Sequence, residues 1–205
     1  MEQHLCPVWV GYFLASPVRR LFCNPQDVVG PYVGPGMTVL DIGCAMGFFS
    51  LPMAQMVGPS GRVLCVDCQD KMLASLERRA RRAGLLERLA LRPCKGDSLC
   101  LDDLGAEVDF ALAFGVVHEA YDTARFFADV FKALKPGARV LVAEPRMPVN
   151  GAAFATTVSL AAQAGFEVLA RPKVHNCRAV LLARTVQPRS GTGQATREED
   201  AGGHN

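Results

Sequence analysis

The sequence lacks an apolar run long enough to cross a bilayer, although half of its 205 residues are hydrophobic. A spanning helix needs about 20 consecutive apolar residues, so we expect no transmembrane segment. Charge of one sign is also scarce: the net charge is only +2, which by itself gives no reason to expect a nucleic-acid partner. Residues 1–4 lack the basic segment of a secretory signal. We therefore expect a globular, cytoplasmic protein.

A second close cysteine pair is absent as well, although the chain has eight cysteines. The C-x-x-C spacing from Cys65 to Cys68 lies along a predicted strand, where alternation points the two side chains to opposite faces. A structural zinc site would need a further close pair. The sequence therefore predicts no metal site and favours reduced, buried thiols.

What the chain does contain is an alternation of apolar strands and helices, at a length that suits one α/β domain. Strands are expected at 38–42, 62–66, 89–93, 108–117, within 135–145, at 166–170 and at 178–183. Helices are expected at 24–32, 48–56, around 72–82, at 123–134 and at 152–164. The turn between the last two strands is so short that these strands must run antiparallel.

The strand at 38–42 runs into a glycine turn and then into a helix. Gly43 and Gly47 permit a tight turn and the close approach of a ligand, which a Cβ would block. Asp41 places a carboxylate at the carboxyl end of the strand, where ligands bind in open α/β sheets. A dinucleotide fingerprint starting at Gly43 fails at two of its three glycine positions, and the chain has no Gly-Lys pair for a P-loop. A strand-turn-helix without any ligand remains the alternative for this segment alone.

Residues 38–49 resemble the first motif of the class I S-adenosylmethionine-dependent methyltransferases, Asp/Glu-x-Gly-x-Gly-x-Gly, with Ala45 in the place of the middle glycine. Residues 66–73 resemble the family's second motif, and residues 134–137 resemble the Leu-Lys-Pro-Gly turn before its fifth strand. The resemblance extends over about 36–184. It implies a doubly wound α/β fold, whose mostly parallel seven-stranded sheet ends in a C-terminal antiparallel hairpin.

The resemblance also implies S-adenosyl-L-methionine as the cofactor. In the family, the acid of the second motif binds the ribose, the next residue packs on the adenine, and a later acid accepts a hydrogen bond from the adenine amino group. Asp67, Cys68 and Asp97 match these places, and Asp67 follows Gly43 at the distance typical of α/β nucleotide folds. The implied cofactor site consists of Asp41, Gly43, Cys44, Gly47, Asp67, Cys68, Asp97, Ser98 and Phe114.

Catalytic candidates follow the predicted strand at 108–117. This strand brings His118 and Glu119 to the edge where the family's fourth motif faces the transferable methyl group. Neutral imidazole is available near pH 7, so His118 is the candidate base, and Glu119 either orients it or caps a helix. The alternative is that His118 only shapes the pocket. Candidate substrate contacts are Trp9, Glu144, His175 and Arg178, the last two on condition that the sixth strand is parallel to the others.

Three parts of the chain are expected. Residues 1–35 form an N-terminal flap, 36–186 the methyltransferase domain, and 187–205 a disordered tail without apolar residues larger than alanine. The flap is rich in aromatic residues, which suits a lid over the acceptor pocket. A helix lying on a membrane surface, with Trp9 inserted, is its alternative.

The function implied is methyl transfer from S-adenosylmethionine, directly in line, to a small-molecule acceptor. A thiol or metalloid methyltransferase, in which cysteines bind the acceptor, is the enzymatic alternative. A cofactor-binding or membrane-surface interaction protein is the alternative that is not an enzyme. The fold cannot choose the acceptor, because function resides in the site that the fold carries.

Overall fold

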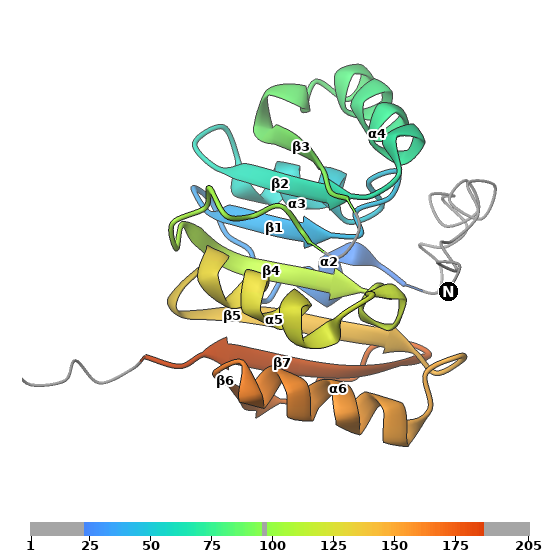
Figure 1. Ribbon diagram of the computed structural model, residues 1–205. Helices are drawn as coiled ribbons and strands as arrows, with labels where there is room; N and C mark the ends of the chain where they lie inside the picture. The colour runs from blue at the N-terminus through green and yellow to red at the C-terminus, as the bar shows by residue number, and fades with distance from the viewer. Residues whose placement is uncertain (1–22, 96–97, 187–205) are drawn as a thin grey trace, which may run out of the picture.

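The computed structural model describes residues 23–95 and 98–186, which form a seven-stranded sheet with helices on both faces (Figure 1). The strands are β1 (Thr38–Ile42), β2 (Arg62–Asp67), β3 (Leu89–Pro93), β4 (Val108–Phe114), β5 (Leu134–Pro145), β6 (Phe166–Ala170) and β7 (Cys177–Arg184). The helices are α2 (Pro25–Val29), α3 (Ser50–Val57), α4 (Asp70–Arg82), α5 (Thr123–Ala133) and α6 (Gly151–Gln163), with 3-10 turns η2 (Leu86–Arg88) and η3 (Val117–Glu119).

The strand order is β3-β2-β1-β4-β5-β7-β6. Strands β1 to β5 pair in parallel, whereas β7 is antiparallel to both β5 and β6. Because β7 is reversed relative to both of its neighbours, β6 runs in the same direction as β1 to β5. The predicted fold class is therefore confirmed, including the C-terminal antiparallel hairpin.

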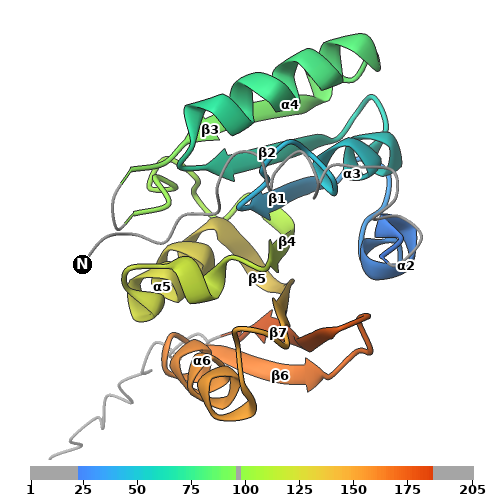
Figure 2. The ribbon, with the colours of Figure 1, turned by 90° about the vertical axis from the view of Figure 1, so that its right-hand side faces the viewer.

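The sheet separates two hydrophobic cores, which Figure 2 shows as helix layers on either side of the strands. Helices α2, α3 and α4 cover one face, and α5 and α6 cover the other. Strand β1 supplies both cores, since Val39 packs with the first group and Leu40 with the second. Burial on both faces explains why the central strands are almost continuously apolar in sequence.

The last part of the predicted N-terminal extension packs against the sheet. Val29 of α2 is fully buried, and the ring of Tyr32 stacks on Phe110 of β4 with centroids 5.4 Å apart. These residues therefore contribute to the hydrophobic core. The rest of the predicted flap, including Trp9, and the predicted tail from 187 onward lie outside the described residues, as does Asp97.

Two predicted helix boundaries are wrong by a few residues. Helix α2 ends at Val29 rather than near Tyr32, because Pro31 has no amide hydrogen with which to continue the helix. Helix α3 begins at Ser50 instead of Phe48, because the chain is still in the glycine turn up to Phe49.

Two strand boundaries also differ. Strand β4 ends at Phe114, not at Val117, because Gly115 has a φ of 66° and turns the chain out of the sheet. The apolar composition that continues to Val117 belongs to the start of η3. Strand β5 begins at Leu134, which pairs with Val108, so the Leu-Lys-Pro-Gly segment lies within the strand instead of preceding it.

Within the described ranges, none of the helices combines the length and the hydrophobicity that a bilayer crossing demands.

Candidate active site

A cavity of about 470 Å³ opens at the carboxyl ends of β1, β2 and β4. In open α/β sheets this edge binds ligands where the chain connections diverge to the two sides, and β1 is such a place, with β2 on one side and β4 on the other. The sequence-predicted residues that line it are Asp41, Gly43, Cys44, Asp67, Cys68, Phe114, His118 and Glu119.

The glycine turn forms one wall of the cavity. A Cβ on Gly43 would lie 2.7 Å from Cγ2 of Val116, and one on Gly47 would lie 2.3 Å from Cδ1 of Leu76. Both glycines also have positive φ, at 69° and 83°. Both positions therefore require glycine for the packing of the turn itself, and Gly43 also lines the cavity.

Ala45 occupies the position of the missing middle glycine and has a φ of 45°. This left-handed conformation is unfavourable for a residue with a Cβ. Its backbone amide donates to Oδ2 of Asp67 over 2.8 Å, which holds the turn against the end of β2. The turn therefore keeps the geometry of a glycine position with alanine in place.

Asp67 is held by two backbone amides, since Gln69 N donates to Oδ1 over 2.9 Å in addition to the bond from Ala45. Burial raises the pKa of this carboxyl group, and the backbone hydrogen bonds oppose that rise. An ionised carboxylate has about four lone-pair sites, so capacity remains for hydroxyl groups of a ligand.

Asp41 is 2% exposed, and its Oδ2 accepts a hydrogen bond of 2.5 Å from the hydroxyl of Ser50. Desolvation by burial raises the pKa of Asp41 to about 7, although the Ser50 hydrogen bond acts in the opposite direction. Sequence reasoning missed Ser50. Its one signal is its position at the start of α3, directly after the glycine turn.

His118 lies on η3 beside the cavity, and its Nδ1 is hydrogen-bonded to Oε2 of Glu144. Oε1 of Glu144 accepts two further bonds, from the amides of Val116 (3.2 Å) and Val117 (2.8 Å). The same carboxylate thus fixes both the backbone of η3 and the imidazole. The hydrogen bond to Glu144 raises the pKa of His118 against the opposing effect of burial.

Two predicted residues can be placed relative to this imidazole. Glu144, a candidate substrate contact, is 1% exposed and is not among the residues that line the cavity, and its carboxylate binds His118. Glu119 was expected to orient the imidazole or to cap a helix. Its Oε1 lies 3.9 Å from Nε2 of His118, on the side of the ring away from Glu144.

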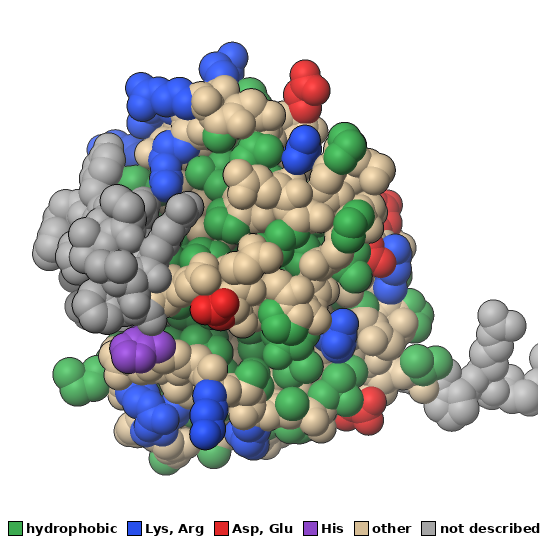
Figure 3. All heavy atoms as spheres, turned by 180° about the vertical axis from the view of Figure 1, so that it is seen from behind, with side chains coloured by type: hydrophobic (Ala, Val, Ile, Leu, Met, Phe, Trp, Pro, Cys, Tyr) green, Lys and Arg blue, Asp and Glu red, His purple; other side chains and the backbone are tan. Residues whose placement is uncertain are grey.

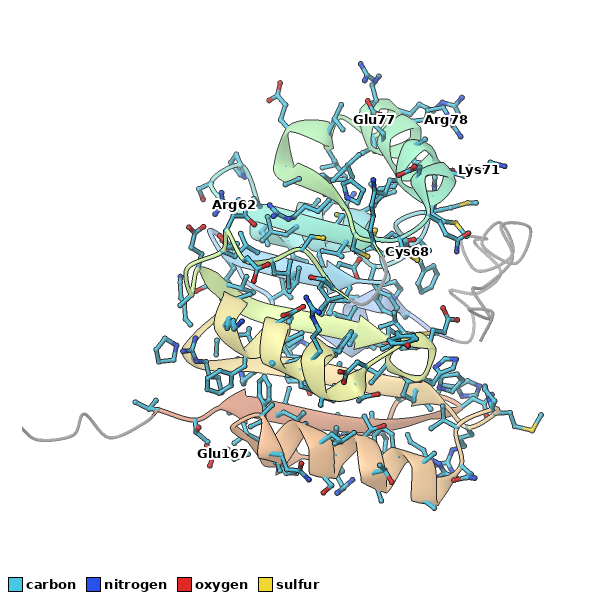
Figure 4. All side chains as sticks on the ribbon, viewed as in Figure 1. Arg62, Cys68, Lys71, Glu77, Arg78 and Glu167 are labelled. Carbon is cyan, nitrogen blue, oxygen red and sulfur yellow. The ribbon has the colours of Figure 1, made fainter. Side chains whose placement is uncertain are left out.

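Cysteines form another part of the wall. Cys68 and Cys94 both line the cavity and hydrogen-bond to each other, which lowers the pKa of Cys68 and raises that of Cys94. They follow the paired residues Asp67 and Pro93 at the ends of two neighbouring parallel strands. Figure 4 shows Cys68 at the end of β2, on the side of the sheet where the cavity opens.

The C-x-x-C spacing is split between two environments, as alternation predicts, although Cys68 lies just beyond the end of β2. Cys65 is fully buried, and its Sγ donates to the carbonyl of Val63. The described ranges contain seven cysteines, and no disulfide joins any two of them. The same ranges contain no group of three or more His, Cys, Asp or Glu residues arranged to hold a metal ion.

Several candidates lie away from the cavity lining. Gly47 packs against Leu76, and the hydroxyl of Ser98 accepts a bond of 3.1 Å from the amide of Cys100. Since β6 is parallel to β1 to β5, His175 and Arg178 lie near the same edge of the sheet. However, Nε of Arg178 donates to the carbonyl of Val149 over 3.2 Å, and neither residue lines the cavity.

Comparison with known proteins agrees with this geometry. A family model described as "Methyltransferase domain" matches residues 34–181. A demethylmenaquinone methyltransferase of Lactobacillus johnsonii is 29% identical over 119 residues, which are 58% of this chain and 48% of the relative. An arsenite methyltransferase of Halobacterium salinarum is 31% identical over 127 residues, or 59% of this chain and 30% of the relative.

Among solved structures, a SAM-dependent methyltransferase from Aquifex aeolicus matches with a TM-score of 0.77 at 22% identity, over 88% of this chain and 100% of that one. The chain spans less than half the length of the two curated relatives named above. The family model nevertheless covers most of the chain, from just before β1 into β7. The chain therefore belongs to the class I S-adenosylmethionine-dependent methyltransferase family.

Proposed function

We propose that this chain transfers a methyl group from S-adenosylmethionine to a small-molecule acceptor, with His118 as the general base. The observation that carries the proposal is the buried Glu144, which orients His118 at the wall of a cavity that also contains Asp41 and Asp67. A base fixed in this way beside a cavity is typical of an enzyme, because a structural histidine needs no access to a ligand.

The cavity suits the proposed cofactor in its size and in the side chains that line it. Its volume of about 470 Å³ lies within the usual range for small-molecule sites. Asp67 would hold the ribose hydroxyls, and the cavity-lining side chains of Phe114, Met72 and Leu99 offer apolar surface to the adenine. The buried carboxyl of Asp41 would face the cationic end of the cofactor, where a negative charge is favourable.

The protein's own contribution begins with the tautomer of His118. Glu144 is an acceptor toward Nδ1, so the neutral imidazole carries its proton on Nδ1 and leaves Nε2 to accept a proton from the acceptor molecule. The bound cofactor supplies a methyl group that its sulfonium already activates. The remaining tasks of the protein are to align the acceptor and to exclude water.

The names of the two relatives support a small acceptor, since one concerns demethylmenaquinone and the other arsenite. The chain covers only part of either relative, so neither name is transferred to it. A base is required when the acceptor atom is a hydroxyl or an ammonium group, whereas a carbanionic or metalloid acceptor needs none.

The test is methyl turnover against a panel of phenols, amines, thiols and arsenite. Removing His118 should lower turnover on a hydroxyl or amine acceptor by about two to four orders of magnitude, the usual contribution of a general base. His118→Ala and His118→Asn should be equally impaired, because asparagine accepts no proton. His175→Ala is the matched control, as His175 does not line the cavity.

Full activity in His118→Asn would refute the role of His118 as general base. Alignment of the acceptor would then account for the rate of methyl transfer without a protein base. Binding of S-adenosylmethionine without turnover on any acceptor would instead favour the cofactor-binding protein that is not an enzyme.

A metalloid acceptor is the second candidate, and a specific observation favours it. The hydrogen-bonded thiols of Cys68 and Cys94 face the cavity together, and two such sulfurs are suited to a soft, thiophilic atom. In that case arsenite turnover should disappear in Cys68→Ser and in Cys94→Ser. It should persist in Cys100→Ser, because Cys100 is exposed and lies outside the cavity lining.

A further inference from the structure

A second hollow, of about 520 Å³, lies beside the proposed active site and is lined by four cationic side chains. Arg146 follows β5, Arg171 and Lys173 lie between β6 and β7, and Arg178 lies on β7. Apolar surface from Phe154, Pro172 and Val174 completes it. We call this hollow the basic groove. Figure 3 shows Lys and Arg side chains gathered in this part of the molecule, at the end that carries β6 and β7.

The basic groove has no acidic residue in its lining. Over the described ranges, none of its four cationic groups forms an ion pair. Four cationic side chains elsewhere each bind a carboxylate: Arg62 with Glu107, Arg81 with Glu77, Arg92 with Asp103, and Lys135 with Asp109. The groove differs from these four places because its lining offers no acid to pair with its cations.

Concentrating positive charge in this way is unfavourable for the free protein, because like charges repel at short range. Gly151, the first residue of α6, also lines the groove, so the positive end of that helix adds to the potential. Arg178 is partly buried, and its bond to the carbonyl of Val149 holds the guanidinium in place. An anion in the groove would relieve this repulsion and would meet donors that are already positioned.

The basic groove adjoins the proposed active site through a single short segment. Pro145 and Pro148 line the active-site cavity, and Arg146 between them lines the groove. In addition, Arg178 is the register partner of Glu144, the residue that orients His118. A molecule of moderate length would therefore reach from one hollow into the other.

We infer that the basic groove binds a phosphate or carboxylate group of the methyl acceptor, whose apolar part lies on Phe154 and Val174. This inference rests on the proposed function, since it specifies the class of acceptor that enters the same site. The acceptor is thus an amphipathic anion, held by its charged group while the accepting atom lies next to His118.

Pyrophosphate is the probe for the groove itself, measured by titration calorimetry on the full chain. The double variant Arg171→Glu, Lys173→Glu should weaken pyrophosphate binding by about tenfold or more, since charge-assisted hydrogen bonds are lost. The matched control is Arg78→Glu, Arg82→Glu on the exposed face of α4, which changes the net charge equally. Figure 4 shows Arg78 projecting from α4 near the opposite end of the sheet. Equal weakening in both double variants would overturn the inference, because binding would then follow net charge alone.

The affinity for S-adenosylmethionine separates this inference from the proposed function. It should be unchanged in the groove variant, while KM for anionic acceptors rises and kcat is largely retained. Loss of pyrophosphate binding without any change in KM would overturn the acceptor assignment and leave methyl transfer intact. No turnover on any acceptor, with pyrophosphate binding as expected, would count against the proposed function alone.

A lipid headgroup carries the same phosphate chemistry, so a separate experiment must test whether the groove binds lipid. Sedimentation with phosphatidylglycerol vesicles should be weak and equal in the native chain and in the groove variant. Strong vesicle binding that depends on Arg171 and Lys173, without binding of pyrophosphate, would overturn the inference that the groove binds the anionic group of a soluble acceptor.

Discussion

The active-site cavity and the basic groove lie at one edge of the same sheet but are built on opposite electrostatic principles. In the cavity, the acids Asp41 and Asp67 are buried, and each is held by hydrogen bonds from the protein itself. In the groove, the cations are mostly exposed, and only Arg178 is held by the backbone. Buried and satisfied groups are suited to chemistry that needs fixed geometry, whereas exposed and unpaired charges are suited to recognition of an outside charge.

The largest expected effect is a loss of rate on replacing Glu144, which lies between the active-site cavity and the basic groove. Glu144→Gln keeps an oxygen for the amides of Val116 and Val117, but presents an NH₂ donor to Nδ1 of His118. The imidazole would then carry its proton on Nε2 and lose its function as a base. We expect the rate of a single turnover to fall by about 10² to 10⁴, with the fold intact.

Glu119→Gln is the matched control and should cost much less, because Glu119 lies 3.9 Å from the ring and does not orient Nδ1. A Glu144→Gln variant with the native rate would show that the tautomer of His118 is irrelevant to the reaction.

The pH dependence of turnover should also report the interaction of Glu144 with His118. Glu144 raises the pKa of His118 above its ordinary value of 6.5, so activity should fall as the pH drops through a value higher than that. The ion pair of His118 with Glu144 also stabilises the fold. This contribution is fully present below the pKa that His118 has in the unfolded chain, and it is lost as the pH rises through the higher pKa of His118 in the folded protein. The rate of the native enzyme from pH 5 to 9 tests this prediction. A midpoint below 6.5 would be incompatible with Glu144 acting on His118.

Stability, in contrast, should depend on Asp41 in the cavity. A pKa raised from 3.8 to about 7 means that the folded state binds the proton more tightly, so stability falls as the pH rises from about 4 to about 7. The shift corresponds to about 4 kcal/mol, as an order of magnitude. Asp41→Asn should therefore stabilise the free protein most at pH 8 and little at pH 4.

Urea unfolding at the two pH values measures this difference. Asp102→Asn, which removes one exposed carboxylate on the 94–107 connection, is the control. A stabilisation of Asp41→Asn that is equal at both pH values would mean that Asp41 is already ionised at pH 4 in the fold.

The smallest effect is expected in the glycine turn. Ala45 adopts a φ of 45°, which glycine tolerates at no steric cost. Ala45→Gly should stabilise the protein by up to about 1 kcal/mol, because relief of left-handed strain exceeds the added entropy of the unfolded chain. Thermal unfolding beside Ala83→Gly, at an ordinary right-handed position, measures the difference. Destabilisation of both variants by the same amount would show that the turn is not strained.

The sequence was sufficient to predict the cavity side of this comparison. Asp41 and Asp67 each end a strand, and parallel neighbouring strands must bring their carboxyl ends together. The partner of His118 could not be read in the same way. Glu144 reaches His118 only because β4 and β5 pair with Phe114 beside Ala143, and this register is not visible in the composition of either strand.

The basic groove could not be predicted for a related reason. Its four cations come from the end of β5, the connection after β6, and β7. They meet because β7 lies between β5 and β6, and the composition of the strands shows neither this order nor its register. The end of β4 at Phe114 could not be predicted either, because the apolar composition continues beyond it to Val117. The hydrogen bond from Ser50 to Asp41 was also hidden, because a single serine in the sequence does not show which group it contacts.

The central claim is that the acid-lined cavity binds S-adenosylmethionine through Asp67. Titration calorimetry of the native chain and of Asp67→Ala tests it most directly, with Asp102→Ala as a control for the loss of one exposed carboxylate and thermal unfolding to verify the fold. Leaving the ribose hydroxyls without their acceptor should weaken binding by about 1–3 kcal/mol, or about 5- to 150-fold. A folded Asp67→Ala variant that binds S-adenosylmethionine as tightly as the native chain would contradict the claim.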